Sequence, residues 1–146
     1  EESLKEVNAN YHRGGTYITI EGPRFSTKGE SGLYRLWGMD IIGMTASPEV
    51  FLAREAEMCY TTMAHVTDYD VWHIAEESVN VELVVRTLME NISLAQETIK
   101  KMVEKIDLES SCSCQFGLEN AIITNPNHID PKKREKLNLL IGKYLD

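Results

Sequence analysis

The chain has 146 residues, 42% of them apolar, which is enough for a single globular domain with a sizeable core. Its formal net charge of -8 argues against nucleic acid as a partner, because phosphate backbones bind clustered Lys and Arg, and the only basic run is 132–134. No apolar stretch approaches the ~20 residues that span a bilayer, and no signal peptide opens the chain, so we expect a soluble, cytoplasmic protein without membrane contact.

Strand and helix signals alternate in the first part of the chain. β-branched and aromatic residues predict a strand at 16–20, buried on both faces. Thr27 and Glu30 have the spacing of a capping box, which predicts a helix that Gly38 terminates. A second strand is expected at 40–44. This order of strand, helix and strand is typical of the α/β class.

The next segment predicts a helix followed by a third strand. Ser47 provides a capping hydroxyl and Pro48 is tolerated at the first helical position, so a helix should begin here and run to about Met58. The apolar stretch 59–67 is then a candidate for a third buried strand, and Cys59 is expected in the core.

Two helices are predicted in the remainder. Apolar positions recur every three or four residues from Asn80, a candidate cap, to about 106, which predicts a long amphipathic helix. A shorter helix is expected from Pro131 to about Tyr144. We therefore predict one α/β domain over residues 1–146, in which 107–146 form a C-terminal loop and helix extension.

Two carboxylates directly follow the predicted third strand. Asp68 and Asp70 would lie at the carboxyl end of that strand, where open α/β sheets bind ligands. Positions two apart in an extended chain face the same side, so both carboxylates can reach one small molecule. Burial and mutual repulsion in a cleft would raise at least one pKa, which suits a proton donor. Alternatively, both aspartates are ordinary turn formers.

Polar and apolar side chains also follow the first two predicted strands. Met44 offers a soft apolar surface to a sugar, and the Thr45 hydroxyl can donate to a phosphate oxygen. Phe25 and Ser26 suit a planar ring that is held by stacking and by hydrogen bonds at its edge. The alternatives are core packing for Met44, a turn for Thr45 and a helix staple for Phe25. Together these positions indicate a nucleoside site.

The His and Cys spacings do not indicate a metal. None of the four histidines has metal-ligand spacing with a cysteine, so we expect no metal site. Cys112 and Cys114 form a C-x-C pair that is either reduced or part of a disulfide, and the residues leave both possibilities open. No P-loop, nucleophile elbow or dinucleotide fingerprint is present, which argues against NTPases, serine hydrolases and Rossmann dehydrogenases.

Three motifs together carry a resemblance to a known family. They are Thr19-Ile20-Glu21-Gly22-Pro23-Arg24-Phe25-Ser26, Gly43-Met44-Thr45 with the helix that follows it, and Thr67-Asp68-Tyr69-Asp70. In this combination the chain resembles the 5′-methylthioadenosine phosphorylases of the trimeric-type purine nucleoside phosphorylase family, from about His12 to about Ile106. It is also similar to archaeal members that carry a C-x-C near the C-terminus. The fold implied is a phosphorylase-like three-layer α/β fold with a mixed sheet, whose N-terminal strands this chain would lack.

The resemblance implies a role for each candidate residue. Phe25 and Ser26 would contact the purine, Met44 the ribose, and Thr45 the phosphate. Asp68 and Asp70 would lie at the purine edge. Relatives that cleave 6-oxopurine nucleosides have Asn where this chain has Asp68, and a carboxylate acceptor suits the exocyclic amine of adenine. Those relatives have a His where this chain has Val81, which with Val84 and Val85 would form an apolar pocket for a methylthio group; core packing is the alternative.

The activity implied is phosphorolysis of 5′-methylthioadenosine to adenine and 5-methylthioribose 1-phosphate, a step of purine and methionine salvage. Asp68 is the candidate donor of a proton to N7 of the departing adenine. Inorganic phosphate is the co-substrate, and no cofactor is expected. Two other functions stay open at this point: a broader purine nucleoside phosphorylase, and a noncatalytic nucleoside-binding or assembly subunit.

The resemblance further implies that this chain alone is an incomplete enzyme. Family members are much longer, and most of their phosphate site, including an Arg and a His, has no counterpart here. Residues 1–6 have the pattern of a helix already under way, so we expect an N-terminal portion elsewhere. The family forms trimers or dimers of trimers, which implies a homo-oligomer.

Overall fold

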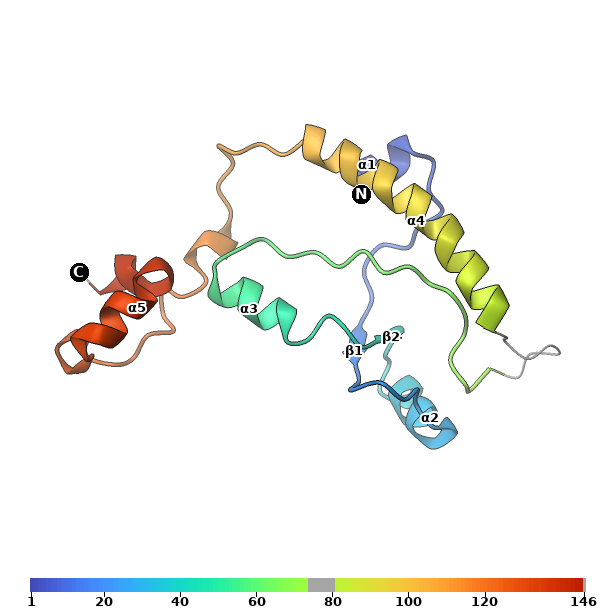
Figure 1. The fold of residues 1–146 in the computed structure, drawn as a ribbon, viewed down its shortest axis with the longest axis horizontal. Coiled ribbons are helices and arrows are strands. Elements are labelled where there is room, and N and C mark those ends of the chain that lie inside the picture. Colours follow the sequence, from blue (N-terminus) through green and yellow to red (C-terminus); the bar gives the residue numbers. More distant parts are fainter. Residues whose placement is uncertain (74–80, 146) are drawn as a thin grey trace. The chain divides into compact units, whose positions relative to one another are not determined.

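The computed structural model describes residues 1–73 and 81–145. The chain folds as two compact units, and each unit contains two segments that are distant in the sequence. The first contains Glu1–Met44 and Met63–Leu108, and the second contains Thr45–Thr62 and Glu109–Asp146. Figure 1 shows the helices and the strands, and both kinds of element are present as the predicted α/β class requires.

The strands of the first unit form a parallel pair. β1 (Tyr17–Thr19) and β2 (Ile41–Gly43) lie side by side, and Ile20 N donates to Gly43 O at 2.9 Å just beyond them. The connection between them contains α2 (Lys28–Leu36), as a parallel crossover requires. Both predicted strands are therefore confirmed, and their carboxyl ends meet at one edge of the sheet.

The capping box at the start of α2 is confirmed. Thr27 Oγ1 accepts from Glu30 N at 3.3 Å, and Glu30 Oε2 accepts from Thr27 N at 2.7 Å. Hydrogen bonds from the Arg24 guanidinium, at 2.6 and 2.8 Å, and from Thr27 lower the pKa of Glu30 to about 2. Gly38 follows the helix with φ of 77°, the left-handed conformation expected of a terminating glycine.

The prediction of a third strand at 59–67 is wrong. These described positions form no strand, and Val66, which was expected to be buried, is 62% exposed. A strand requires a neighbour along its hydrogen-bonding edge, and apolar content alone does not supply one. Val66 O instead accepts a side-chain hydrogen bond from Asn91 Nδ2 at 3.2 Å.

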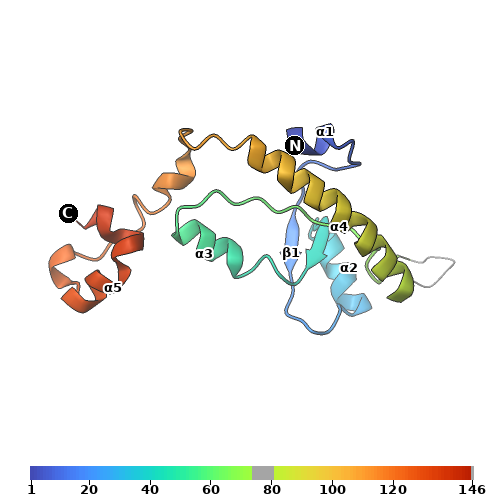
Figure 2. The same ribbon diagram turned by 45° about the horizontal axis from the view of Figure 1, so that its top comes forward.

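The long amphipathic helix is confirmed as α4 (Val81–Glu104). Its predicted cap, Asn80, lies outside the described residues. α1 (Glu2–Glu6) lies beside α4, as Figures 1 and 2 both show, and Lys105 Nζ pairs with Glu6 Oε1 at 2.7 Å where the two helices meet.

Helix α3 (Glu49–Glu55) belongs to the second unit, and it begins one residue later than the sequence predicts. Pro48 is the N-cap residue and not the first helical residue, so the Ser47 hydroxyl lies too early to cap, and no side chain caps this helix. The helix ends before the predicted Met58, and Glu57 follows it with φ of 56°.

The predicted last helix is confirmed as α5 (Pro131–Ile141), which continues into the 3₁₀ turn η3 (Gly142–Tyr144). Two further 3₁₀ turns, η1 (Ser113–Phe116) and η2 (Pro126–His128), precede it. Asp130 Oδ1 caps α5 by accepting from the backbone N–H groups of its first turn, at 2.9 and 3.3 Å.

Glu57 joins the two segments of the second unit. Its carboxylate accepts from Leu118 N at 3.0 Å, from Lys143 Nζ at 2.5 Å and from the Tyr144 hydroxyl. Burial alone would raise the pKa of Glu57, but hydrogen bonds from Lys143, Tyr144 and Leu118 N outweigh it and lower the pKa to about 2. The residues just after α3 are thus tied to the segment that follows η1 and to η3.

Few apolar side chains are buried in the described residues. Only Ala95, at 8%, and Leu145, at 3%, fall in the buried class there, and the strands are half-buried where full burial was expected. The accessible surface is 12109 Å². Two separate compact proteins of the same total mass would expose about 9,000 Å². The accessible surface of the chain is larger than this value, so the large exposed area does not result from how the two units are placed.

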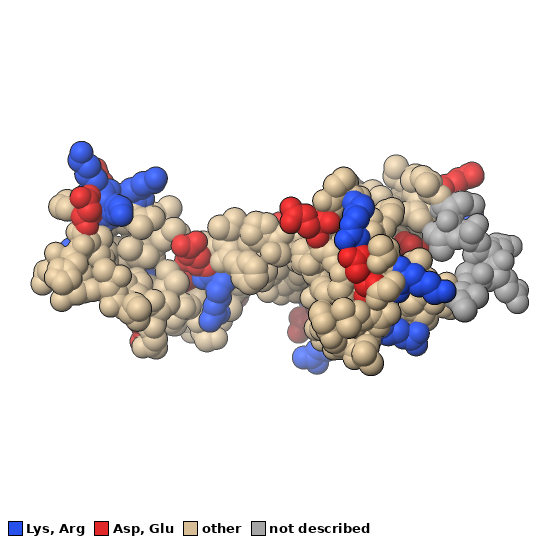
Figure 3. Space-filling model, turned by 90° about the horizontal axis from the view of Figure 1, so that it is seen from below, with Lys and Arg blue, Asp and Glu red and all other residues tan. Residues whose placement is uncertain are grey.

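The outer surface mixes charges of both signs. On the face drawn in Figure 3, Lys and Arg are interspersed with Asp and Glu over a mostly uncharged surface. None of the helices in residues 1–73 and 81–145 has the length and apolar character needed to cross a membrane.

Candidate functional site

The segment that follows β1 passes directly against the end of β2. Met44 Sδ lies 2.7 Å from the position that a Cβ would take on Gly22. A side chain at position 22 would make the flexible end of the Met44 side chain move aside. The segments that follow β1 and β2 therefore lie next to each other at one edge of the strand pair.

Ser26 and Asp70 form the direct contact between two of the predicted site segments. Ser26 Oγ donates to Asp70 Oδ1 at 2.8 Å across a sequence separation of 44 residues, and both side chains are half-buried. The same Asp70 oxygen accepts from Val71 N at 2.8 Å. Asp70 is therefore fixed in orientation by two donors.

Asp68 is in a different environment. It is exposed, and its Oδ1 accepts from the Thr67 hydroxyl at 2.6 Å. The chain turns at Asp70, whose carbonyl accepts from His73 N at 3.0 Å. Because no strand precedes the two aspartates, the alternation argument that put both carboxylates on one side does not apply, and the structure does not provide the predicted burial of Asp68.

An aromatic group that was not predicted holds the segment around Asp70 against α2. Tyr69 and His73 stack with ring centroids 4.4 Å apart, and Trp72 meets His73 edge-on at 5.2 Å. Arg35, on α2, places its guanidinium carbon 3.9 Å from the Trp72 ring centroid, within the range of a cation–π contact. The aromatic residues beside Asp68 and Asp70 were a signal, but nothing in the sequence pointed to Arg35.

The other predicted site residues lie at the surface. Phe25 is 84% exposed and Val81 is 80% exposed, while Val85, one turn along α4, is also exposed. Thr45 is exposed and is the first residue of the second unit. Among the predicted residues, the structure brings together Ser26 and Asp70.

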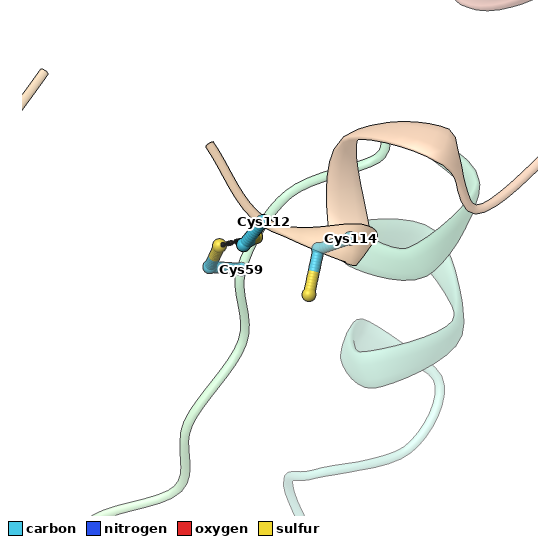
Figure 4. A group of neighbouring side chains, drawn as sticks. All are labelled: Cys59, Cys112 and Cys114. Atoms are coloured by element: carbon cyan, nitrogen blue, oxygen red, sulfur yellow. Dashed lines mark hydrogen bonds between the residues drawn. The ribbon is translucent and has the colours of Figure 1, made fainter. Parts of the chain in front are cut away.

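Three cysteines converge in the second unit, as Figure 4 shows. Cys59 follows α3, and Cys112 and Cys114 lie at the start of η1. All three are free thiols; Cys59 Sγ lies 3.0 Å from Cys112 Sγ, and the three sulfur atoms lie within 4.8 Å of one another. The thiol hydrogen bond between Cys59 and Cys112 raises the pKa of Cys59 to about 11 and lowers the pKa of Cys112. The prediction of Cys59 as a core residue is wrong, because this side chain is exposed.

Residues 1–106 match the family model of the Phosphorylase superfamily. Among curated proteins, the S-methyl-5′-thioadenosine phosphorylase of Geobacter sulfurreducens is 46% identical over 143 residues, which are 98% of this chain and 50% of that protein. The chain spans about half the length of the curated relatives it matches.

Solved structures give a consistent result. A methylthioadenosine phosphorylase from an antarctic soil metagenomic library matches with a TM-score of 0.85 and 37% identity, over 95% of this chain and 50% of that one. The methylthioadenosine phosphorylase of Schistosoma mansoni in complex with adenine matches with a TM-score of 0.58 and 39% identity, over 65% of this chain and 34% of that one.

Proposed function

Since this chain belongs to the Phosphorylase superfamily, we propose that it takes part in the phosphorolysis of 5′-methylthioadenosine to adenine and 5-methylthioribose 1-phosphate. The observation that carries the proposal is 46% identity, over nearly the whole chain, to a protein named for this activity. The enzyme would be a pentosyltransferase that uses inorganic phosphate and no other cofactor.

The reaction breaks the bond between the ribose C1′ and N9 of adenine. As that bond lengthens, positive charge develops on the sugar and negative charge on the base. Phosphate attacks C1′, and a proton delivered to N7 neutralises the departing adenine. General acid catalysis of such a departure typically contributes 10²–10⁴-fold to the rate. We assign the donor role to Asp68, which requires a substrate-bound site that shields this carboxyl from water.

Asp70 and Ser26 would hold the purine edge. The Ser26 hydroxyl donates to one Asp70 oxygen, which leaves the other oxygen of the carboxylate to accept from a donor on the base. Phe25 is exposed and has no fixed ring partner among the described residues, so it is available to stack on the purine. This pairing of Ser26 with Asp70 supports a polar purine edge.

The sugar side of the proposed site is apolar. Met44 would contact the ribose, and Val81 and Val85 would contact the methylthio group from the first turns of α4. Thr45 would donate to phosphate. The proposal includes a cytoplasmic location in purine and methionine salvage, and assembly as a trimer or a dimer of trimers, which the exposed apolar residues of α4 support.

The test is adenine release from 5′-methylthioadenosine by the full protein, with and without phosphate. We expect release that depends on phosphate and yields a sugar 1-phosphate. Turnover of inosine at a similar kcat/KM would indicate a broader purine nucleoside phosphorylase. Binding of adenine without phosphate-dependent turnover would indicate a noncatalytic subunit. Hydrolysis to free methylthioribose would contradict the proposal.

Replacing Val81 with histidine tests the methylthio pocket. A polar ring should disfavour the apolar thioether and favour a 5′-hydroxyl, so we expect the ratio of kcat/KM for 5′-methylthioadenosine over adenosine to fall by about 10-fold or more. Steady-state kinetics with both nucleosides measures this ratio. Val103→His, near the other end of α4, is the matched control and should leave the ratio unchanged. An unchanged ratio in Val81→His would remove this residue from the site.

A further inference from the structure

The two segments that carry the three cysteines are held together independently of their sulfur atoms. Glu57, two residues before Cys59, accepts from Leu118 N at 3.0 Å, and Leu118 lies just beyond η1. Within η1, Gln115 N donates to Cys112 O at 3.2 Å and Gly117 N to Cys114 O at 3.1 Å. These hydrogen bonds therefore fix the backbone near the three cysteines, and the sulfur atoms lie close together without a bond between any two of them.

The spacing of the sulfur atoms fits one ion. Three points that all lie within 4.8 Å of one another share a centre no farther than about 2.8 Å from each, and the Zn–S bond length is about 2.3 Å. In a tetrahedral site two sulfur ligands lie about 3.8 Å apart, so Cys59 Sγ and Cys112 Sγ, now 3.0 Å apart, would separate by about 0.8 Å on binding. Shifts of about half an ångström at each sulfur are within the reach of small χ1 rotations. From this geometry we propose that Cys59, Cys112 and Cys114 bind one Zn²⁺ ion through three thiolates.

A metal accounts for the cluster better than a disulfide does. A disulfide between any two of the cysteines uses two sulfur atoms and leaves the third beside it without a role, whereas one ion uses all three. Thiolates are soft ligands that favour ions such as Zn²⁺. Binding replaces three S–H bonds by three Zn–S bonds and releases the three protons to solvent. Cys59 is exposed, so a water molecule can complete the tetrahedron.

One nearby cation suits the charge of the filled site. Three thiolates and one Zn²⁺ carry a net charge of about -1, which is stabilised by positive charge close by. Lys143 Nζ donates to Gln115 O at 2.8 Å, next to Cys114, but its charge is already balanced by the Glu57 carboxylate at 2.5 Å, so the positive charge is that of Arg54. Arg54 Nε lies 3.3 Å from the position of a Cβ on Gly117, and Cys114 O lies 3.2 Å from the same position. No residue of the proposed nucleoside site takes part, so phosphorolysis and metal binding can be tested separately.

The experiment is a metal titration of the full protein, purified under argon with its thiols reduced. We expect one Zn²⁺ per chain by elemental analysis after gel filtration. Co²⁺, used as a spectroscopic substitute, should give a sulfur-to-metal charge-transfer band and the visible bands of tetrahedral coordination. Each of Cys59→Ser, Cys112→Ser and Cys114→Ser should weaken Zn²⁺ binding by about 100-fold or more.

Ser113→Ala is the matched control, since Ser113 lies between two of the ligands, and it should bind as the unchanged protein does. Circular dichroism of each variant establishes that it is folded. Three results would overturn the proposal: no Co²⁺ charge-transfer band in fully reduced protein, unchanged affinity in Cys59→Ser, or a disulfide among the three cysteines in protein whose thiols were alkylated before cell lysis.

Discussion

Asp68→Asn is expected to lower kcat for adenine release from 5′-methylthioadenosine by about 100-fold or more. An amide is nearly the same size as a carboxyl but cannot deliver a proton to N7 of the leaving base. It also offers an N–H group where the exocyclic amine of adenine needs an acceptor. The loss should therefore be larger for adenine nucleosides than for inosine, whose carbonyl oxygen can accept from the amide.

Steady-state kinetics with both nucleosides, together with a pH profile of kcat, measures this effect. A proton donor gives an alkaline limb to the profile, and the variant should lack that limb. Asp107→Asn, in the loop after α4, is the matched control and should retain normal turnover. Adenine release by Asp68→Asn at the unchanged rate would show that another group protonates the base.

Glu57→Gln is expected to give the largest loss of stability, a fall in Tm of about 5 °C or more. The carboxylate accepts from three donors that belong to two distant segments, and a glutamine keeps the shape but loses the charge that pairs with Lys143. Differential scanning calorimetry measures the fall. Glu55→Gln changes an exposed carboxylate at the end of α3 and is the matched control, with little expected change.

The same contact predicts how stability depends on pH. The pKa of Glu57 in the folded state is about 2, below the ordinary value of 4.5, so the contribution of its charged form is fully present above about pH 4.5 and is lost as the pH falls toward 2. The Tm difference between the unchanged protein and Glu57→Gln should therefore shrink across this range. A difference that stays constant from pH 6 to pH 3 would contradict the assignment.

Local sequence signals predicted the structure well where the interaction itself is local. The capping box of Thr27 and Glu30 needs two residues three apart, and the periodicity of α4 needs its own residues alone. The boundary of α3 was less accurate, since Pro48 became the cap and displaced Ser47 from that role. A Ser-Pro pair does not specify the first residue of a helix to within one position.

Contacts between distant segments were not predictable in the same way. The partners of Glu57 follow it by about 60 to 90 residues, and Cys59 joins a C-x-C pair separated from it by 53 residues. The prediction of a third strand was wrong for a related reason. The residues around Val66 are apolar, as in a buried strand, but a strand also needs a neighbouring strand for its backbone hydrogen bonds. The candidate site was predicted as a set of strand ends, and the hydrogen bond of Ser26 to Asp70 could not be inferred from either segment alone.

The low burial of apolar side chains affects the heat capacity of the chain. Unfolding of an ordinary domain raises the heat capacity by about 12–15 cal/mol/K per residue, mainly because apolar groups become hydrated. Here large apolar side chains of α4, such as Leu88 and Met89, already face water in the described structure. Unfolding of these residues alone would therefore change the heat capacity little, and the corresponding free-energy curve would be nearly linear in temperature. In the proposed assembly these side chains would be covered, so separation of the subunits would carry the heat-capacity change that unfolding of this chain alone lacks.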